Sequence, residues 1–150
     1  MTALLPIHEQ IAAIMERHPQ YWRSDEALKE AIAVWGAEGH VNDSGVFADY
    51  ETEIVARCGR AVAEVGIYKL RDGVFVHCTH YMTATSGSGY APCVWCSTPH
   101  DTAKEARLAG IAELLERLRD AGHDSEKAAH EDVRQLRQQL QRQIEQPSLF

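Results

Sequence analysis

The sequence predicts a single α+β domain, in which a three-stranded antiparallel sheet lies between N-terminal helices and a long C-terminal helix. Apolar residues recur at helical spacing near both ends of the chain, and a turn signal in the middle separates two strand-like runs. A length of 150 residues and a hydrophobic fraction of 45% fit one domain with its own core. We expect a domain at 1–145, divided into a helical part at 1–58, a β-β-β-α unit at 60–120 and a helix at 125–145, followed by a separate peptide at 146–150.

The N-terminal segment predicts two short helices. Pro6 can begin the first, because proline fits the opening turn of a helix, and Pro19 can end it. Ser24 is a good N-cap for the second, because its side chain can accept a hydrogen bond from a free backbone N–H. We expect Gly36 to end this second helix. The two apolar faces consist of Ile7, Ile11, Ile14 and Met15 in the first helix and Leu28, Ile32 and Trp35 in the second.

A third helix is predicted after the turn-forming residues 42–45. Gly59 is placed to end it, because glycine readily adopts the left-handed conformation found at helix C-termini. With this helix, the whole segment 1–58 becomes helical. Its apolar face consists of Phe47, Tyr50, Ile54 and Cys58, which recur at helical spacing.

After residue 59 the apolar residues no longer recur at helical spacing, and the strand-like run from 61 to 70 predicts a strand. Asp72-Gly73 predicts a two-residue hairpin turn in which both residues have positive φ. The return strand is expected from 74 to about 84. With this loop, Tyr68 faces His77 across the hairpin.

A third strand is predicted at 90–96, after a looser turn at 85–89. Two helices are expected to follow the sheet. The first begins at Thr98-Pro99 or at Asp101 and covers one face of the sheet. The second runs from about 125 to 145 and projects toward the C-terminal peptide. Their apolar faces consist of Leu108, Ile111, Leu115 and Leu118 in the first helix and Val133, Leu136, Leu140 and Ile144 in the second.

The charge pattern limits the kinds of partner. The chain has 15 Lys and Arg against 22 Asp and Glu, a net charge of −7, which disfavours strong binding to duplex DNA. The excess is greatest in residues 1–59, where 4 basic residues stand against 10 acidic ones. We predict no membrane span, because no apolar run approaches about 20 residues. Without a recognisable secretion signal, the cysteines fit a cytoplasmic protein.

The final five residues are the most specific motif in the chain. Gln146, Pro147, Ser148, Leu149 and Phe150 resemble the short peptide by which bacterial proteins dock on the replication sliding clamp. The resemblance implies that Gln146 is the anchoring amide, that Ser148 is the small polar spacer, and that Leu149 and Phe150 enter the hydrophobic pocket of the clamp. Pro147 stands where the motif more often has leucine, and it keeps the segment extended.

The resemblance implies a non-enzymatic accessory or regulatory protein that docks on the bacterial sliding clamp, in DNA replication or repair or in their inhibition. A bacterium, a phage or a plasmid could encode such a protein. The acidic N-terminal helices could bind a second protein. One alternative is an anti-defence or inhibitor protein whose acidic face mimics nucleic acid. The other is a small zinc-dependent or nucleophilic enzyme.

The enzyme alternative depends on cysteine and histidine residues. Zinc prefers four nitrogen or sulfur ligands, which Cys78, His80, Cys93 and Cys96 could supply. We nevertheless predict no metal and no cofactor, because residues three apart in a strand point to opposite faces, and Val94 and Trp95 are strand formers. The same reasoning disfavours a redox Cys-x-x-Cys, which normally opens a helix. Cys78 or Ser97 could instead act as a nucleophile beside His77, His80 or His100.

Overall fold

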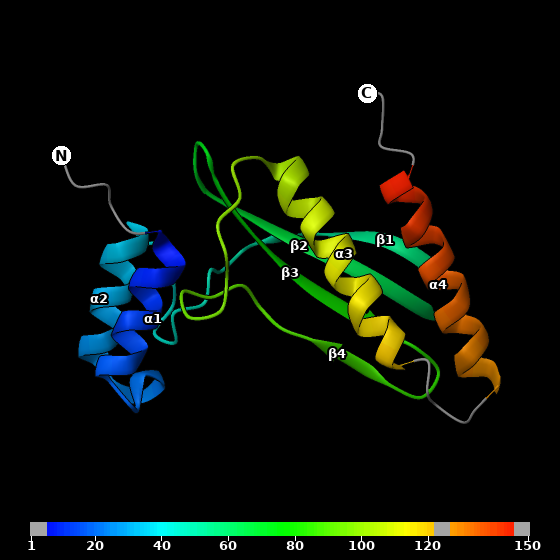
Figure 1. The fold of residues 1–150 in the computed structure, drawn as a ribbon, viewed down its shortest axis with the longest axis horizontal. Helices are drawn as coiled ribbons and strands as arrows, with labels where there is room; N and C mark the ends of the chain where they lie inside the picture. Colours follow the sequence, from blue (N-terminus) through cyan, green and yellow to red (C-terminus); the bar gives the residue numbers. More distant parts are fainter. Residues whose placement is uncertain (1–5, 122–126, 146–150) are drawn as a thin grey trace.

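The computed structural model describes residues 6–121 and 127–145, and these residues form a mixed α+β fold (Figure 1). The predicted α+β class is confirmed, with four strands in the sheet where three were expected. The predicted start of the last helix, at 125, lies outside the described residues. The elements are α1 (Ile7–Arg17), η1 (Tyr21–Arg23), α2 (Asp25–Trp35), β1 (Glu51–Cys58), β2 (Ala61–Arg71), β3 (Val74–Met82), β4 (Gly87–Gly89), α3 (Ala103–Ala121) and α4 (Lys127–Glu145).

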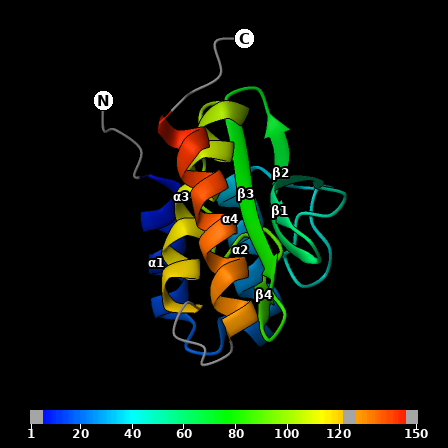
Figure 2. The same cartoon turned by 90° about the vertical axis from the view of Figure 1, so that its right-hand side faces the viewer.

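The sheet has the strand order β1-β2-β3-β4, and every neighbouring pair is antiparallel. Helices α3 and α4 cover one face of it (Figure 2). The predicted apolar face of α3 is confirmed at Ile111 and Leu118, which are fully buried, and at Leu115, which is partly buried against the same core. Leu114, which the prediction did not include, is also fully buried. We call the buried residues of this layer the sheet–helix core: Val55, Ala56, Ala61, Ala63, Val65, Tyr81, Ile111, Leu114, Leu118, Val133, Leu136 and Leu140.

Helices α1 and α2 confirm the two predicted N-terminal helices and lie side by side (Figure 1). The predicted N-cap is also confirmed, because the Ala27 N–H donates a hydrogen bond of 3.1 Å to Ser24 Oγ. The buried residues of both helices form one cluster with Leu70 of β2 and Val76 of β3, so the two helices pack at the hairpin end of these strands. We call this second cluster the N-terminal core: Ile11, Ile14, Ala27, Ala31, Trp35, Ala37, Phe47, Leu70, Val76 and Val94.

The predicted third helix is wrong, because residues Glu51–Cys58 form strand β1. Gly59 lies in the turn that leads from β1 into β2 rather than at a helix end. Phe47 is fully buried, but it enters the N-terminal core from a loop. Its helical spacing with Tyr50 is therefore coincidental. Residues that favour a strand are present in β1, namely Thr52, Ile54 and Val55.

The predicted hairpin at Asp72-Gly73 is confirmed, but its register differs from the prediction by one residue. Tyr68 faces Val76, so Tyr68 and His77 are not cross-strand neighbours. Of the two turn residues, only Gly73 has a positive φ, of 78°. The predicted turn requires positive φ at both, whereas here the pairing shifts by one residue beside the turn, as in a β-bulge.

The predicted third strand at 90–96 is also wrong. The strand that pairs with β3 is β4, formed by Gly87–Gly89, which had been predicted as a loop. Residues 94–96 instead form a turn. Val94 and Trp95 are strand formers, but here their side chains pack in the N-terminal core and fix a loop. Side-chain burial therefore outweighs strand propensity in this segment.

Helix α4 packs against β1 and α3, so it does not project from the domain as predicted. The predicted burial of Val133, Leu136 and Leu140 is confirmed, whereas Ile144 is 38% exposed and the prediction for it is wrong. Although α3 and α4 have 19 residues each, no helix within 6–121 and 127–145 is long and apolar enough to cross a membrane.

Two glutamines of α4 bind the outer edge of β1. The Arg57 N–H donates to Gln139 Oε1 at 2.9 Å, and Gln139 Nε2 donates to the Arg57 carbonyl at 2.7 Å. Gln143 Nε2 donates in the same way to the Val55 carbonyl. These amides satisfy backbone groups that face away from β2, which an edge strand otherwise leaves without a partner.

Candidate functional site

A cluster of polar side chains lies between α3, β3 and the segment that follows β4. Strand alternation turns His77 and Thr79 toward α3. On α3 itself, Glu113 and Arg117 lie one helical turn apart and therefore share a face. We call the following residues the Glu113 cluster: His77, Thr79, Tyr90, His100, Glu113 and Arg117.

Glu113 is the acceptor at the centre of this cluster. Thr79 Oγ1 donates to Glu113 Oε2 at 2.6 Å, and the Tyr90 hydroxyl lies 2.8 Å and 2.7 Å from the two carboxylate oxygens. Burial opposes ionisation of Glu113, but these hydrogen bonds and the nearby His77 imidazole outweigh it and lower its pKa to about 2. Burial, and then Glu113 itself, raise the pKa of the Tyr90 phenol. At neutral pH the site therefore holds a carboxylate and a protonated phenol.

Arg117 connects this carboxylate site to the edge of the sheet. Its Nη1 donates to Thr79 Oγ1 at 2.8 Å, and its Nη2 donates to Ser88 Oγ in β4. The guanidinium also lies 5.4 Å from the ring centroid of Tyr81 and 5.8 Å from that of Tyr90. Because the one side chain of Arg117 binds both Thr79 of β3 and Ser88 of β4, it fixes the short edge strand β4 to the helix layer.

Two histidines extend the cluster toward the turn before α3. His77 Nδ1 and His100 Nε2 are 2.9 Å apart, so one of them donates a hydrogen bond to the other. The other nitrogen of His77, Nε2, lies 3.8 Å from Glu113 Oε2 and is buried without a hydrogen-bond partner among the described residues. Burial, and then the neighbouring His77, lower the pKa of His100. The neutral form of the His100 ring is therefore favoured.

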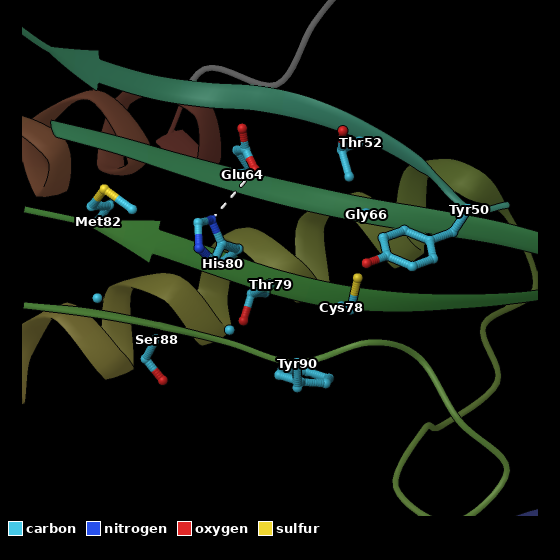
Figure 3. Close-up of a pocket in the computed structure, with 12 residues that line it drawn as sticks. Tyr50, Thr52, Glu64, Gly66, Cys78, Thr79, His80, Met82, Ser88 and Tyr90 are labelled. Atoms are coloured by element: carbon cyan, nitrogen blue, oxygen red, sulfur yellow. Dashed lines mark ion pairs between the residues drawn. The ribbon is translucent and has the colours of Figure 1, made fainter. Parts of the chain in front are cut away.

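A groove of about 580 Å³ lies on the face of the sheet opposite α3 and α4 (Figure 3). Its floor includes Gly66, beside which the Tyr50 ring packs over the Cys78 thiol. A Cβ on Gly66 would lie 2.5 Å from Cys78 Sγ and 2.8 Å from the Tyr50 ring, so a larger residue would displace one of them. Across the groove, His80 Nδ1 lies 3.5 Å from Glu64 Oε2.

Within the described residues, no hydrogen bond joins either predicted nucleophile, Cys78 or Ser97, to a histidine, although Cys78 and His80 line the same groove. Cys78 lies in the groove, on the opposite face of β3 from His77. Burial raises the pKa of the Cys78 thiol to about 11, so this sulfur is protonated at neutral pH. Ser97 Oγ accepts a hydrogen bond of 3.0 Å from the Cys93 N–H and so serves the local turn.

The four candidate zinc ligands fall into two separate pairs. Cys78 and His80 line the groove, whereas Cys93 and Cys96 lie at the two ends of the turn beside the N-terminal core. Within the part of the chain that the structure describes, no group of three or more His, Cys, Asp or Glu side chains is arranged to hold a metal ion. The four residues are therefore not brought together as one site.

The predicted docking peptide, Gln146 to Phe150, lies outside the described residues.

The structure describes the acidic N-terminal region from residue 6 onward, and it pairs some of the acidic side chains with basic ones. Glu30 binds Arg17 at 2.9 Å and His18 at 2.6 Å, and in β1 Glu53 binds Arg107 at 2.7 Å. These basic partners reduce the negative charge that a nucleic-acid mimic would need to present.

Sequence reasoning missed the Glu113 cluster. The sequence indicates His77 and His100 as partners of a cysteine or serine nucleophile, but it does not indicate Thr79, Glu113 or Arg117. The usable signal was the pair Glu113 and Arg117, spaced by four beside the apolar stripe of α3, together with polar residues at alternate positions of β3. Neither pattern shows that the helix and strand face each other, so the cluster required the structure.

Comparison with known protein families found no matching family, and comparisons with characterised proteins and with solved structures found no match either.

Proposed function

We propose that this protein docks on the bacterial replication sliding clamp through residues 146–150 and acts there as a non-enzymatic accessory or regulatory protein. The observation that carries the proposal is the motif itself, Gln146-Pro147-Ser148-Leu149-Phe150. It combines an amide, a small polar residue and two large apolar side chains in the order found in clamp-binding peptides. The α+β body would then be the part that acts on, or blocks, other proteins at the clamp.

The end of α4 is compatible with such a peptide. Leu140 is fully buried, but one turn later Ile144 is 38% exposed, and Glu145 is exposed as well. Residue 145 is therefore already at the surface of the domain. A peptide that begins at the next residue starts from a position that a large ring-shaped partner can reach.

The expected affinity follows from the two apolar side chains. Burying a leucine and a phenylalanine contributes roughly 3–6 kcal/mol before the peptide's ordering is subtracted. A contribution of this size alone corresponds to a dissociation constant of about 50 µM at best, so tighter attachment also requires contacts from Gln146 and the peptide backbone. Pro147 lowers the ordering cost, because it keeps the segment extended before binding.

The test is direct binding of the full chain to purified clamp, measured by calorimetry. The double substitution Leu149→Ala and Phe150→Ala should weaken binding by more than about tenfold. Trp22→Ala is the matched control, because Trp22 is large, apolar and 62% exposed, and it belongs to η1, outside the motif. This control should bind as the unmodified chain does.

Equal binding by the unmodified chain and the double variant would show that another surface is responsible, and no binding by either would refute the proposal. The melting temperature separates docking from a structural role. If Leu149 and Phe150 only bind the clamp, the double variant melts with the unmodified chain. A large decrease would mean that they belong to the folded core.

The two alternative functions remain predictions with their own tests. A nucleic-acid mimic would compete with DNA for a DNA-binding enzyme, and reversing the charge of Glu51 and Asp49 would abolish the competition. A zinc enzyme would carry stoichiometric metal after purification. The pairing of Glu30 and Glu53 with basic side chains favours the docking proposal over the mimic.

A further inference from the structure

The segment from Cys93 to Cys96 brings its two sulfur atoms into contact. Residues 94–96 form a turn, and the Ser97 N–H closes it by donating to the Cys93 carbonyl at 3.1 Å. Cys93 Sγ and Cys96 Sγ are 2.7 Å apart. Four residues of a tight turn place the first and last Cα atoms within about 7 Å, the range in which a disulfide can form without backbone rearrangement.

Contacts with the N-terminal core hold this turn in place. The Trp35 indole N–H donates to the Val94 carbonyl at 3.0 Å, and the Val94 N–H donates to the Gly45 carbonyl at 2.9 Å. The Val94 side chain is fully buried, and the Trp95 ring packs 4.9 Å from that of Tyr21. Both residues between the cysteines are thus anchored, so the contact between the sulfur atoms is a property of the folded domain.

The two thiols differ in character and are accessible. Cys93 is half-buried and Cys96 is exposed. The Cys96 thiol, together with the backbone N–H groups of Trp95 and Cys96, lowers the pKa of Cys93 to about 6 against the opposing effect of burial. The hydrogen bond to Cys93, and then burial, raise the pKa of Cys96. Cys93 is therefore suited to attack a disulfide as the thiolate, and Cys96 is suited to react in the second step.

We propose that Cys93 and Cys96 form a reversible redox-active dithiol that exchanges with low-molecular-weight disulfides. The Cys93 thiolate attacks one sulfur of the small disulfide, forms a mixed disulfide and releases one thiolate. Cys96 then loses its proton and attacks Cys93 Sγ, which forms the intramolecular disulfide and releases the second thiolate. Two electrons pass from the cysteine pair to the small disulfide, which is reduced to two thiols.

This site is independent of clamp docking, and sequence reasoning had set it aside. In the predicted strand, Cys93 and Cys96 would point to opposite faces. In the structure the segment is a turn, so the two sulfur atoms lie on the same side and make contact. A preceding parallel strand and a following helix are not required when side-chain anchors such as Val94 hold the turn.

The experiment equilibrates the full chain in buffers of stepped ratios of reduced to oxidised glutathione, then traps free thiols by alkylation under acid quench. Tryptic cleavage after Arg71 and Lys104 gives one peptide that contains Cys78, Cys93 and Cys96, and its fragment ions from breaks between Tyr81 and Tyr90 assign the label of Cys78 separately from those of Cys93 and Cys96. We expect this peptide to lose the labels of Cys93 and Cys96 in one two-electron transition and to lose the mass of two hydrogen atoms. Cys58 and Cys78 should keep their labels throughout.

Two single variants identify the roles of the sulfurs. In Cys96→Ser, the mixed disulfide between Cys93 and glutathione should accumulate, because the second thiol is missing. In Cys93→Ser, glutathione should add to Cys96 more slowly. Cys58→Ser is the matched control and should exchange as the unmodified chain does. In the unmodified chain at pH 7, alkylation of Cys93 should exceed that of Cys78 by more than about tenfold, because Cys78 is buried and protonated.

The proposal is overturned if Cys93 and Cys96 remain labelled at every glutathione ratio, or if they gain and lose label independently. Protection that persists in excess reductant and disappears with a chelator would also overturn it, because it would identify the pair as metal ligands. These readouts come from the unmodified chain, so they do not depend on whether a variant folds.

Discussion

The sheet–helix core takes all of its buried residues from regular elements, whereas the N-terminal core takes several from loops. In the first, β1, β2, β3, α3 and α4 each present one apolar face to a shared layer. In the second, Ala37, Phe47 and Val94 enter from segments outside any helix or strand. The difference shows that the two cores rest on different kinds of sequence information, one periodic and one not.

The chemistry of the two regions differs in the same way. Above the sheet–helix core, four members of the Glu113 cluster (His77, Thr79, Glu113 and Arg117) occupy regular positions on β3 and α3, and Tyr90 and His100 join them from the segment between β4 and α3. Beside the N-terminal core, the reactive cysteine pair depends on a loop that Val94 and Trp35 hold in place. A substitution that destabilises only one of the two cores should therefore perturb only the site that lies beside that core.

The largest effect is expected in the sheet–helix core. Leu114→Ala removes a fully buried side chain from the layer between α3 and the sheet. It should destabilise the protein by about 2–5 kcal/mol, through lost burial and the cavity left behind. Urea unfolding followed by circular dichroism measures this loss. A decrease below about 1 kcal/mol would mean that the layer repacks easily and is less well ordered than its burial indicates.

A smaller and more local effect is expected in the N-terminal core. Trp35→Phe keeps an aromatic ring beside Phe47, but it removes the donor to the Val94 carbonyl. An unsatisfied buried carbonyl costs about 1–3 kcal/mol. Hydrogen exchange should show lost protection in α1, α2 and the 93–96 turn, with α3 and α4 little changed. Equal loss in both regions would show that the two cores unfold as one unit.

The smallest effect is expected in the Glu113 cluster. Glu113→Gln should reduce stability at pH 7 by about 1 kcal/mol, because the charge-assisted hydrogen bonds from Thr79 and Tyr90 are weakened. Glu116→Gln is the matched control, since Glu116 lies on the same helix and is exposed. The control should change stability by less than half as much.

The lowered pKa of Glu113 also predicts how its contribution to stability changes with pH. The pKa of Glu113 is lowered from 4.5 to about 2, so its carboxylate contributes stability above about pH 4.5 that is lost as the pH falls toward 2. The difference in unfolding free energy between Glu113→Gln and the unmodified chain should therefore narrow across this interval. A difference that stays constant between pH 5 and about 2 would contradict the assignment of the low pKa to Glu113.

The elements that sequence reasoning predicted correctly have a local physical cause. Proline and serine define the starts of α1 and α2, and glycine at position 73 defines the hairpin turn. The apolar periodicity of α3 and α4 identified most of their buried positions. In each case the residues that decide the structure are within a few positions of one another.

The errors have a common cause in contacts between distant segments. Phe47 fits a helical pattern by spacing, but its burial against Trp35 comes from a loop. Val94 and Trp95 favour a strand by propensity, but the N-terminal core holds them in a turn. The register of β2 and β3 depends on one bulge beside Gly73, which a two-residue turn does not include. The Glu113 cluster and the groove both need the packing of separate elements.

The edges of the sheet have a consequence for how copies of this chain behave in concentrated solution. At one edge, Gln139 and Gln143 occupy backbone groups of Val55 and Arg57 in β1, to which a strand from a neighbouring copy would otherwise bind. The other edge, β4, offers only Gly87–Gly89, which is too short for a durable ladder. Open-ended growth into fibrils by strand addition would first have to pull α4 away from the sheet.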